Sequence, residues 1–320
     1  MKTKQSEVSV QANARMSERY AVAKKMLSFF ALLLLGSNAH AALNVFACEP
    51  EWAALTRELA GDKANIYTAT GPLQDPHQVQ ARPSLIARAR NAQLLACTGA
   101  ELEIGWLPVV LRESGNNAIQ PGSVGDFEAA KYVTMLEVPT RLDRADGDVH
   151  AAGNPHIQTD ARNFLPVAAA LSKRLTQLDP DHATFYQRQH DAFEKKWQAA
   201  IAKWEQQAAP LKGAPIIVQH RGFPYIENWL GLKQVAELEP KPGMEPSAAY
   251  LGEVLNGLQQ NPARMVIRAA YQDDRSSSWI AERAHIPAVV LPFTVGGTPQ
   301  SGDLYAMFDD TIQRLLAGLK

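Results

Sequence analysis

This sequence of 320 residues has no large excess of positive or of negative charge. Its 32 Lys and Arg residues nearly balance its 33 Asp and Glu residues, and the formal net charge is −1. Global charge therefore gives no support to nucleic acid or an acidic membrane surface as the partner. Internal repeats and low-complexity tracts are also absent, while hydrophobic residues make up 46% of the chain. This balance is typical of a globular protein, and the length allows two compact domains.

Motifs of common nucleotide and catalytic sites are missing as well. The sequence has no G-x-x-x-x-G-K-[ST] match, so energy from ATP would have to come from a partner. It has neither H-E-x-x-H nor G-x-S-x-G, which in many hydrolases place a general base or a nucleophile. These absences favour a binding protein over an enzyme. A secreted zinc hydrolase with three histidines and a water molecule is the alternative from the enzyme class.

Apolar runs near the N-terminus are too short to cross a membrane. The run Met26–Leu35 has about half of the roughly 20 residues that a membrane-spanning helix needs. It follows two lysines and precedes Ala39-His40-Ala41, so residues 1–41 have the three regions of a secretory signal peptide. We predict cleavage near Ala41 and a periplasmic mature protein. The start codon could also be Met16 or Met26.

Cysteine is rare, with Cys48 and Cys97 as its two occurrences. Each ends a short apolar run, so both could lie at the same end of neighbouring strands. In an oxidising compartment such an even pair is first interpreted as a disulfide. Two buried free thiols and a pair of thiolate metal ligands are the alternatives.

The chain after residue 41 alternates short apolar runs with longer amphipathic ones, which is the pattern of α/β layers. The runs predict strands at Leu43–Ala47, Asn65–Thr68, Gln93–Ala96, Pro215–Gln219, Met265–Ala269 and Ala288–Leu291. Helical spacing between them predicts helices such as Glu51–Leu59 and Pro83–Asn91. Because both halves carry this pattern, we predict two sheets in two α/β lobes.

A long helix is predicted between the two halves. It starts after Asp179-Pro180 and ends before Pro210, which gives it a length of about 40 Å. One face carries apolar residues at helical spacing, namely Phe185, Phe193, Trp197, Ile201 and Trp204. The predicted organisation is an N-terminal lobe at 42–179, a linking helix at 180–208 and a C-terminal lobe at 209–320.

Three histidines stand in loops at the ends of predicted elements. His77 lies in a proline-rich loop after a strand, His156 lies in a turn before a helix, and His220 directly follows a strand. Functional side chains concentrate in such loops. Neutral imidazole is the commonest metal-ligand side chain, and three around one ion are typical of Zn²⁺. A metal site is therefore one hypothesis, and three hydrogen-bonding turn residues are the other.

Four stretches of the sequence carry a resemblance to a known family. They are Asp75–His77 with the Pro83-Ser84 that follows, Thr98–Leu107 (TGAELEIGWL), Gly153–Asp160 (GNPHIQTD) and Gln219–Leu232 (QHRGFPYIENWLGL). Over the whole predicted mature chain, the sequence resembles the metal-binding components of ABC importers for zinc and manganese, and in detail the zinc-specific periplasmic ones. The resemblance implies two α/β lobes joined by one long backbone helix, with the metal held in the inter-lobe cleft. It assigns His77 and His156 to the first lobe and His220 to the second.

This resemblance also implies a function. The expected role is high-affinity capture of Zn²⁺ in the periplasm and its delivery to an ABC permease in the inner membrane, with no chemical step. Manganese-binding members usually have a carboxylate at the third position, where this chain has His220, so zinc is favoured over manganese. A manganese-binding member remains an alternative, as does a binding protein for a chelated metal or organic ligand. A monomer is expected because docking requires a free cleft face.

Departures from the family pattern leave the fourth ligand open. Many members place an Asp in an LDPLG-like loop, whereas Leu291–Gly297 contains no carboxylate. The fourth ligand could be water, Asp273 or Asp274. The alternative for these two acids is a solvated turn with Arg275.

The region before the second histidine is the other departure. Many zinc-binding members have a long His- and acid-rich loop there, and this chain has only Asp143, Asp146, Asp148 and His150. His150 could assist in metal capture or be an ordinary loop residue, and the second interpretation is favoured.

Overall fold

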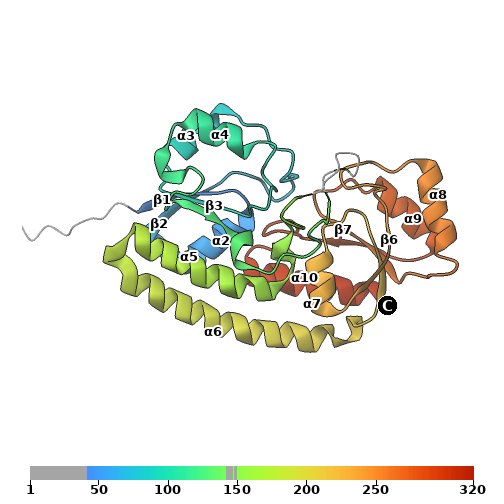
Figure 1. Cartoon of the computed structure of the whole chain (residues 1–320). Helices are drawn as coiled ribbons and strands as arrows, with labels where there is room; N and C mark the ends of the chain where they lie inside the picture. Colours follow the sequence, from blue (N-terminus) through green and yellow to red (C-terminus); the bar gives the residue numbers. More distant parts are fainter. Residues whose placement is uncertain (1–41, 142–146, 148–149) are drawn as a thin grey trace, which may run out of the picture. The chain divides into compact units, whose positions relative to one another are not determined.

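The computed structural model describes residues 42–141, 147 and 150–320 (Figure 1). The predicted signal peptide, with Met16 and Met26, lies outside the described residues, as do Asp143, Asp146 and Asp148. Ala42–Lys320 forms one compact unit. Within the described ranges, no helix is both long and apolar enough to span a membrane.

The first lobe is built on a four-stranded parallel sheet with the order β2-β1-β3-β4. Its strands are β1 (Leu43–Ala47), β2 (Ala64–Thr68), β3 (Leu94–Cys97) and β4 (Asp126–Glu128). Its helices are α2 (Pro50–Ala60), α3 (Pro83–Arg90) and α4 (Leu107–Ser114). Every residue of β3 is buried, as expected of a central strand in a parallel sheet that is covered on both faces.

The second lobe repeats this arrangement with the order β6-β5-β7-β8, again parallel. Its strands are β5 (Pro215–Val218), β6 (Lys233–Glu237), β7 (Met265–Ala269) and β8 (Ala288–Leu291). Its helices are α7 (Pro224–Leu230), α8 (Ala248–Gly257), α9 (Arg275–Ala284) and α10 (Leu304–Gly318). The strand order reverses next to β5, and ligands of open parallel sheets bind beyond the strand ends at such a point.

Six strands lie within one residue of the predicted ranges, but β4 and β6 were not predicted. Both are edge strands of their sheets. They carry polar residues such as Asp126, Glu128 and Lys233 because an edge strand has less of its surface covered by neighbouring strands. The uninterrupted apolar run that marks a central strand is therefore missing from both.

One long helix, α6 (Ala183–Ala208), connects the lobes and runs beneath both sheets, and α5 (Phe164–Leu178) packs along it on the side of the first lobe (Figure 1). The buried face of α6 consists of Tyr186, Phe193, Trp197, Ile201, Trp204 and Ala208. Tyr186, rather than the predicted Phe185, therefore begins the buried stripe. The predicted fold class, two α/β lobes with one long backbone helix, is confirmed.

An aromatic cluster joins elements from both halves of the chain. The ring of Trp197 lies 5.3 Å from Phe164 of α5 and 5.6 Å from Phe308 of α10. Its Nε1 donates a hydrogen bond of 2.7 Å to the carbonyl oxygen of Ala161. Large aromatic side chains bury much apolar area, and the indole N–H needs a partner when it is buried. This cluster holds α6 against both lobes and so positions their loops.

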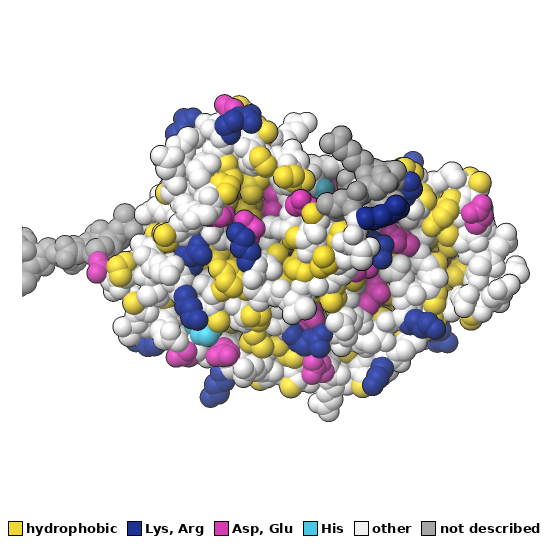
Figure 2. All heavy atoms as spheres, viewed as in Figure 1, with side chains coloured by type: hydrophobic (Ala, Val, Ile, Leu, Met, Phe, Trp, Pro, Cys, Tyr) yellow, Lys and Arg dark blue, Asp and Glu magenta, His cyan; other side chains and the backbone are white. Residues whose placement is uncertain are grey.

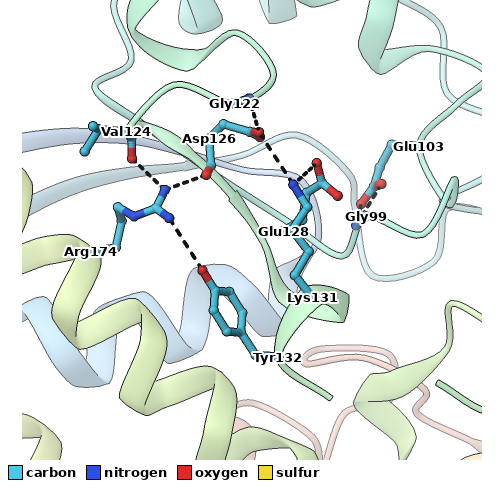
Figure 3. A network of polar contacts seen from close by, with 9 residues as sticks. All are labelled: Gly99, Glu103, Gly122, Val124, Asp126, Glu128, Lys131, Tyr132 and Arg174. Carbon is cyan, nitrogen blue, oxygen red and sulfur yellow. Dashed lines mark hydrogen bonds and ion pairs between the residues drawn. The ribbon is translucent and has the colours of Figure 1, made fainter. Parts of the chain in front are cut away.

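Arg174 of α5 holds the edge strand β4 in place (Figure 3). Its Nη1 donates to the carbonyl oxygens of Val124 and Asp126. Lys131 lies 3.0 Å from the Glu128 carboxylate and 4.0 Å from that of Asp126. These contacts give the end of the sheet hydrogen-bond partners that a further strand would otherwise supply.

Surface charges of both signs are mixed. On the face drawn in Figure 2, basic and acidic side chains are interspersed over both lobes. This distribution agrees with the formal net charge of −1. Such a surface steers a partner through local contacts rather than through a broad field of one sign.

Candidate metal site

Three loops bring the predicted histidines together. His77 lies between β2 and α3, and His156 directly precedes the 3-10 segment Ile157–Thr159. His220 follows β5 after one intervening residue. His77 and His156 therefore come from the first half of the chain, and His220 comes from the second half. In the sequence, α5 and α6 lie between His156 and His220.

The three imidazole rings form one cluster. Ring centroids are 5.2 Å apart for His77 and His156, 5.5 Å for His156 and His220, and 5.9 Å for His77 and His220. One ring nitrogen of each lies within 4.8 Å of those of the other two. Zn–N bonds of about 2.0–2.1 Å place the nitrogens of a tetrahedral site about 3.4 Å apart. A small contraction of side chains would let one ion contact all three.

Two of these rings are held by carboxylates. His77 Nδ1 lies 2.8 Å from Asp75 Oδ1, and His220 Nδ1 lies 2.8 Å from Glu239 Oε2. Because Nδ1 is engaged in each ring, Nε2 is the nitrogen that remains for a metal. The Nε2 of His77 is buried and has no hydrogen-bond partner among the described residues. Asp75 and Glu239 were not predicted to act in the site.

His156 is the most deeply buried of the three, with 1% of its surface exposed. Burial lowers the pKa of His156 well below 6.5, and the neighbouring His77, His220 and His150 lower it further. A neutral imidazole is the form that coordinates a metal. The ring is therefore ready for ligation without losing a proton.

Hydrogen bonds within the two histidine–carboxylate pairs raise the pKa of His220 and lower the pKa of Asp75. Burial alone would lower the pKa of His220, but the hydrogen bond and charge of Glu239 outweigh it and raise that pKa. Burial alone would raise the pKa of Asp75, but the hydrogen bond and charge of His77 lower it. A carboxylate that accepts an N–H from the imidazole raises the basicity of the ring, which strengthens a metal bond at Nε2.

The His77 loop rests on the segment Thr98–Leu107 that was part of the family resemblance. Trp106 is fully buried, and its Nε1 donates to the carbonyl oxygen of Pro76 at 3.1 Å. A Cβ on Gly105 would lie 3.0 Å from the carbonyl oxygen of His77, so glycine allows this close approach. The resemblance in this segment thus corresponds to the support of the His77 loop.

The turn before His156 is held by groups from the second lobe. Asn154 Oδ1 accepts the backbone N–H of His156 at 3.0 Å, and Asn154 Nδ2 donates to the carbonyl oxygen of Arg221 at 2.7 Å. Tyr225 of α7 donates its hydroxyl to the Asn154 carbonyl oxygen at 2.8 Å. These bonds connect the loop of His156 directly to the residues around His220.

The other candidate ligands are His150, Asp273 and Asp274. None of them belongs to the group of close ligand atoms that the three histidines form. The ring of His150 is 5.4 Å from that of His77, and His150 lines a cavity of about 370 Å³ together with His156 and His220. Asp273 lines a second cavity, of about 270 Å³. It is exposed and accepts a hydrogen bond of 2.7 Å from Arg275 Nε, which is the solvated turn considered as its alternative. Asp274 is exposed as well.

Trp106, Trp229 and Trp279 do not share one hydrophobic cluster among the described residues. Trp229 and Trp106 belong to two different hydrophobic clusters, and Trp279 packs against a third. Trp229 Nε1 donates to Glu205 at 3.0 Å, and Trp279 lies under the guanidinium of Arg283. These side chains stabilise separate parts of the fold.

Cys48 and Cys97 form a disulfide at the carboxyl ends of β1 and β3. Their sulfurs are bonded to each other, so in this structure they supply no thiolate ligand. The buried carboxyl of Glu103 lies close to them. The backbone N–H of Thr98 donates to Glu103 at 2.8 Å and, more weakly, to Glu49 at 3.3 Å.

A cluster of buried carboxyl groups was not predicted from the sequence. Burial raises the pKa of Glu51 and of Glu103 to about 7 and that of Glu49 well above its usual value. Glu51 in α2 also accepts a hydrogen bond from Thr294 of the second lobe. The lobes are therefore linked beside the histidine cluster by a group that can change its charge.

Two parallel α/β lobes, a long connecting helix and a cluster of imidazoles between the lobes define a metal-binding protein of the solute-binding class. The family model described as zinc-uptake complex component A, periplasmic (ZnuA), matches residues 45–318. The chain belongs to this family. Proteins of this family are substrate-binding components of ABC importers for zinc or manganese, and not enzymes. Capture of a metal ion for import is the function of this chain.

The sequence is similar to that of several bacterial lipoproteins. It is 22% identical to the metal ABC transporter substrate-binding lipoprotein SloC of Streptococcus mutans serotype c, covering 87% of this chain and 90% of SloC. It is 22% identical to the manganese ABC transporter substrate-binding lipoprotein PsaA of Streptococcus pneumoniae, covering 83% and 85%. It is 23% identical to the zinc-binding lipoprotein AdcA of S. pneumoniae, covering 74% of this chain and 47% of AdcA.

Solved structures have the same fold. A crystal structure of ZnuA superposes with a TM-score of 0.73 at 21% identity, covering 87% of this chain and all of that one. A Cd-bound periplasmic metal-binding protein from Candidatus Liberibacter asiaticus superposes with a TM-score of 0.71 at 16% identity, covering 86% and 99%. At these identities the likeness shows the fold alone.

Proposed function

We propose that this protein captures Zn²⁺ in the periplasm through His77, His156 and His220 and delivers it to an ABC permease in the inner membrane. The observation that carries the proposal is the convergence of three imidazole nitrogens within 4.8 Å. The engagement of two Nδ1 atoms by carboxylates adds support, because such pairs fix the tautomer and orientation of metal-binding histidines.

Zinc is the preferred metal because of the ligand chemistry. Imidazole suits Zn²⁺, whereas Mn²⁺ prefers carboxylate, carbonyl and water oxygens. The two carboxylates that contact these imidazoles, Asp75 and Glu239, are each engaged with an Nδ1 atom. A manganese-binding protein is the alternative, since PsaA is named for manganese and AdcA for zinc.

Water would complete the zinc coordination. The ligand-atom group contains three imidazoles and no aspartate among the described residues, and Asp273 is paired with Arg275. Two cavities adjoin the histidines, and His220 lines both. His150 lines the larger of them, which supports the alternative role considered for it, assistance in metal capture.

Export and oligomeric state are part of the proposal. The leader pattern of residues 1–41 supports secretion with cleavage near Ala41, and the N-terminal sequence of the protein from a periplasmic fraction would test it. We propose a monomer, because docking on a permease needs the face around the histidines to be free. Light scattering of the zinc-loaded protein would test this point, and a stable dimer would contradict it.

Metal content and affinity of the mature protein test the ligand assignment. We expect one zinc ion per chain and a loss of at least 100-fold in affinity in each of His77→Ala, His156→Ala and His220→Ala. His285→Ala is the matched control, because this histidine is exposed at the end of α9. Zinc binding that is indifferent to the three ligand substitutions would disprove the site, and a preference for manganese would disprove the metal.

A further inference from the structure

Phe293 has an unusual backbone conformation directly after β8. Its φ is +66°, and only five described non-glycine residues have a positive φ. This left-handed region is unfavourable for a bulky side chain, because the Cβ approaches the following carbonyl oxygen. Such a conformation persists where the surrounding structure demands it, and it is found most often at functional sites.

The phenylalanine ring forms one wall of the histidine cluster. Its centroid lies 5.2 Å from that of His156, in an edge arrangement with an interplanar angle of 62°. Phe223 and Tyr271 pack against the same ring at 5.5 and 5.6 Å. The Phe293 side chain is 6% exposed, so the wall is closed to solvent.

Gly222 shows how close this ring also lies to His220. A Cβ on Gly222 would be 3.1 Å from Cε2 of Phe293 and 3.4 Å from Cδ2 of His220. Both rings therefore border the small space that glycine leaves open. Phe293 is in this way next to two of the three proposed ligands.

Neighbouring contacts keep the wall from moving aside. Thr294 donates its hydroxyl to Glu51 of the first lobe. Phe293 also lines two small cavities of about 10 and 20 Å³, the first bordered mainly by apolar residues such as Phe308 and the second by apolar and polar residues such as Leu102 and Glu51. A side chain of this size cannot be accommodated elsewhere without repacking the core.

This arrangement limits the ligands that a metal can recruit. The cluster offers three nitrogens, and its Phe293 face presents carbon atoms that cannot coordinate. A tetrahedral Zn²⁺ is satisfied by three imidazoles and one further ligand from the open side. Mn²⁺ prefers oxygen ligands such as carboxylates, carbonyls and water. The Phe293 face supplies none of these and leaves no room for one to enter from that side.

We propose that Phe293 is a selectivity-determining residue that closes one face of the histidine site, so that the site accepts Zn²⁺ and rejects Mn²⁺. The inference rests on the proposed function, in which the three histidines hold the metal. It adds a cause of selectivity that lies outside the ligands themselves.

The test compares Phe293→Asp and Phe293→Asn with the wild type. Asp and Asn tolerate the left-handed backbone better than Phe does, so both variants are expected to fold. Affinities for Zn²⁺ and Mn²⁺ are measured by competition with a chelating dye, and Mn²⁺ binding also by loss of the free-ion EPR signal. Circular dichroism of the metal-free proteins reports folding.

We expect the ratio of zinc to manganese affinity to fall at least tenfold in Phe293→Asp, because the carboxylate opens the face and supplies an oxygen ligand. Phe293→Asn is expected to show a smaller fall in this ratio. A fall as large as that in Phe293→Asp would also support closure of the face by the Phe293 ring. A ratio within threefold of the wild type in both variants would overturn the inference. If the Phe293→Asp variant does not fold, the Phe293→Asn variant alone shows whether the ratio of zinc to manganese affinity falls or stays unchanged.

Wild-type binding separates this inference from the proposed function. A wild type that binds zinc through the three histidines, with variants of unchanged selectivity, removes only the role of Phe293. A wild type that does not bind zinc removes the proposed function itself.

Discussion

The Nδ1 atom of His220 lies 2.8 Å from Oε2 of Glu239, although the two residues follow different strands, β5 and β6. The same carboxylate oxygen accepts the backbone N–H of Gly243 at 2.8 Å. Glu239 is therefore itself fixed, and it holds the imidazole with Nε2 left for the metal. Carboxylates that hold a metal-binding imidazole by a hydrogen bond usually contribute about 10- to 100-fold to metal affinity or activity.

Glu239→Gln should weaken zinc binding about tenfold, because the ring keeps a hydrogen-bond acceptor but loses the neighbouring negative charge. Isothermal titration with a competing chelator would measure it. Glu237→Gln is the matched control, since it removes a charge near His220 and leaves the Glu239 hydrogen bond intact. Equal effects of the two substitutions would show that general charge, and not the bond to the ring, supports the site.

Zinc affinity should fall as the pH is lowered. Free imidazole has a pKa of about 6.5, and the charge of Glu239 raises that of His220 in the metal-free protein. A proton therefore competes for this ring already near neutral pH, and metal binding must displace it. We expect at least a tenfold weaker affinity at pH 5 than at pH 7.5, with circular dichroism to verify that the protein stays folded. An unchanged affinity would contradict histidine ligation.

Folding stability should fall as the pH rises from about 5 to 8. Burial raises the pKa of Glu51 from 4.5 to about 7, so between these values the folded protein binds a proton that the unfolded chain releases. Glu51→Gln cannot ionise and can still accept the Thr294 hydrogen bond. At pH 8 the substitution should raise the free energy of unfolding by about 1–3 kcal/mol, and at pH 5 it should have little effect.

Urea unfolding at the two pH values measures this difference. Glu113→Gln is the control, because Glu113 is exposed and pairs with Arg112 on the surface. It should leave the pH dependence as it is in the wild type. A Glu51→Gln variant that is destabilised equally at both pH values would mean that the ionised form of Glu51 is the native one.

The disulfide should contribute substantially to the stability of the first lobe. Cys48 and Cys97 are 49 residues apart, and linking them restricts the unfolded chain. Replacing both by serine should lower the free energy of unfolding by about 2–4 kcal/mol, with the usual contribution of such bonds as the guide. Chemical denaturation with and without a reductant measures it. The double variant should be insensitive to the reductant, and a wild type that is equally insensitive under unfolding conditions would contradict the bond.

Several parts of the site could be predicted from the sequence and others could not. The loop positions of His77, His156 and His220 were recognisable because each lies between segments whose apolar patterns predict strands or helices. Asp75 stood in the recognised loop, yet nothing in the local pattern distinguishes a carboxylate that bonds an imidazole from a solvated one. Glu239 follows β6, an edge strand that was not predicted because it contains several polar residues.

Two α/β lobes, the long helix between them and a short list of possible ligands follow from the amino-acid sequence alone. These features depend on the local periodicity of apolar residues, which each segment carries independently of the rest. The folded chain is needed to see that three of the histidines meet, that Glu239 and Asp75 orient two of them, and that Phe293 closes one face. Those relationships join residues far apart in the chain, and their distances are set by how the two sheets pack against α6.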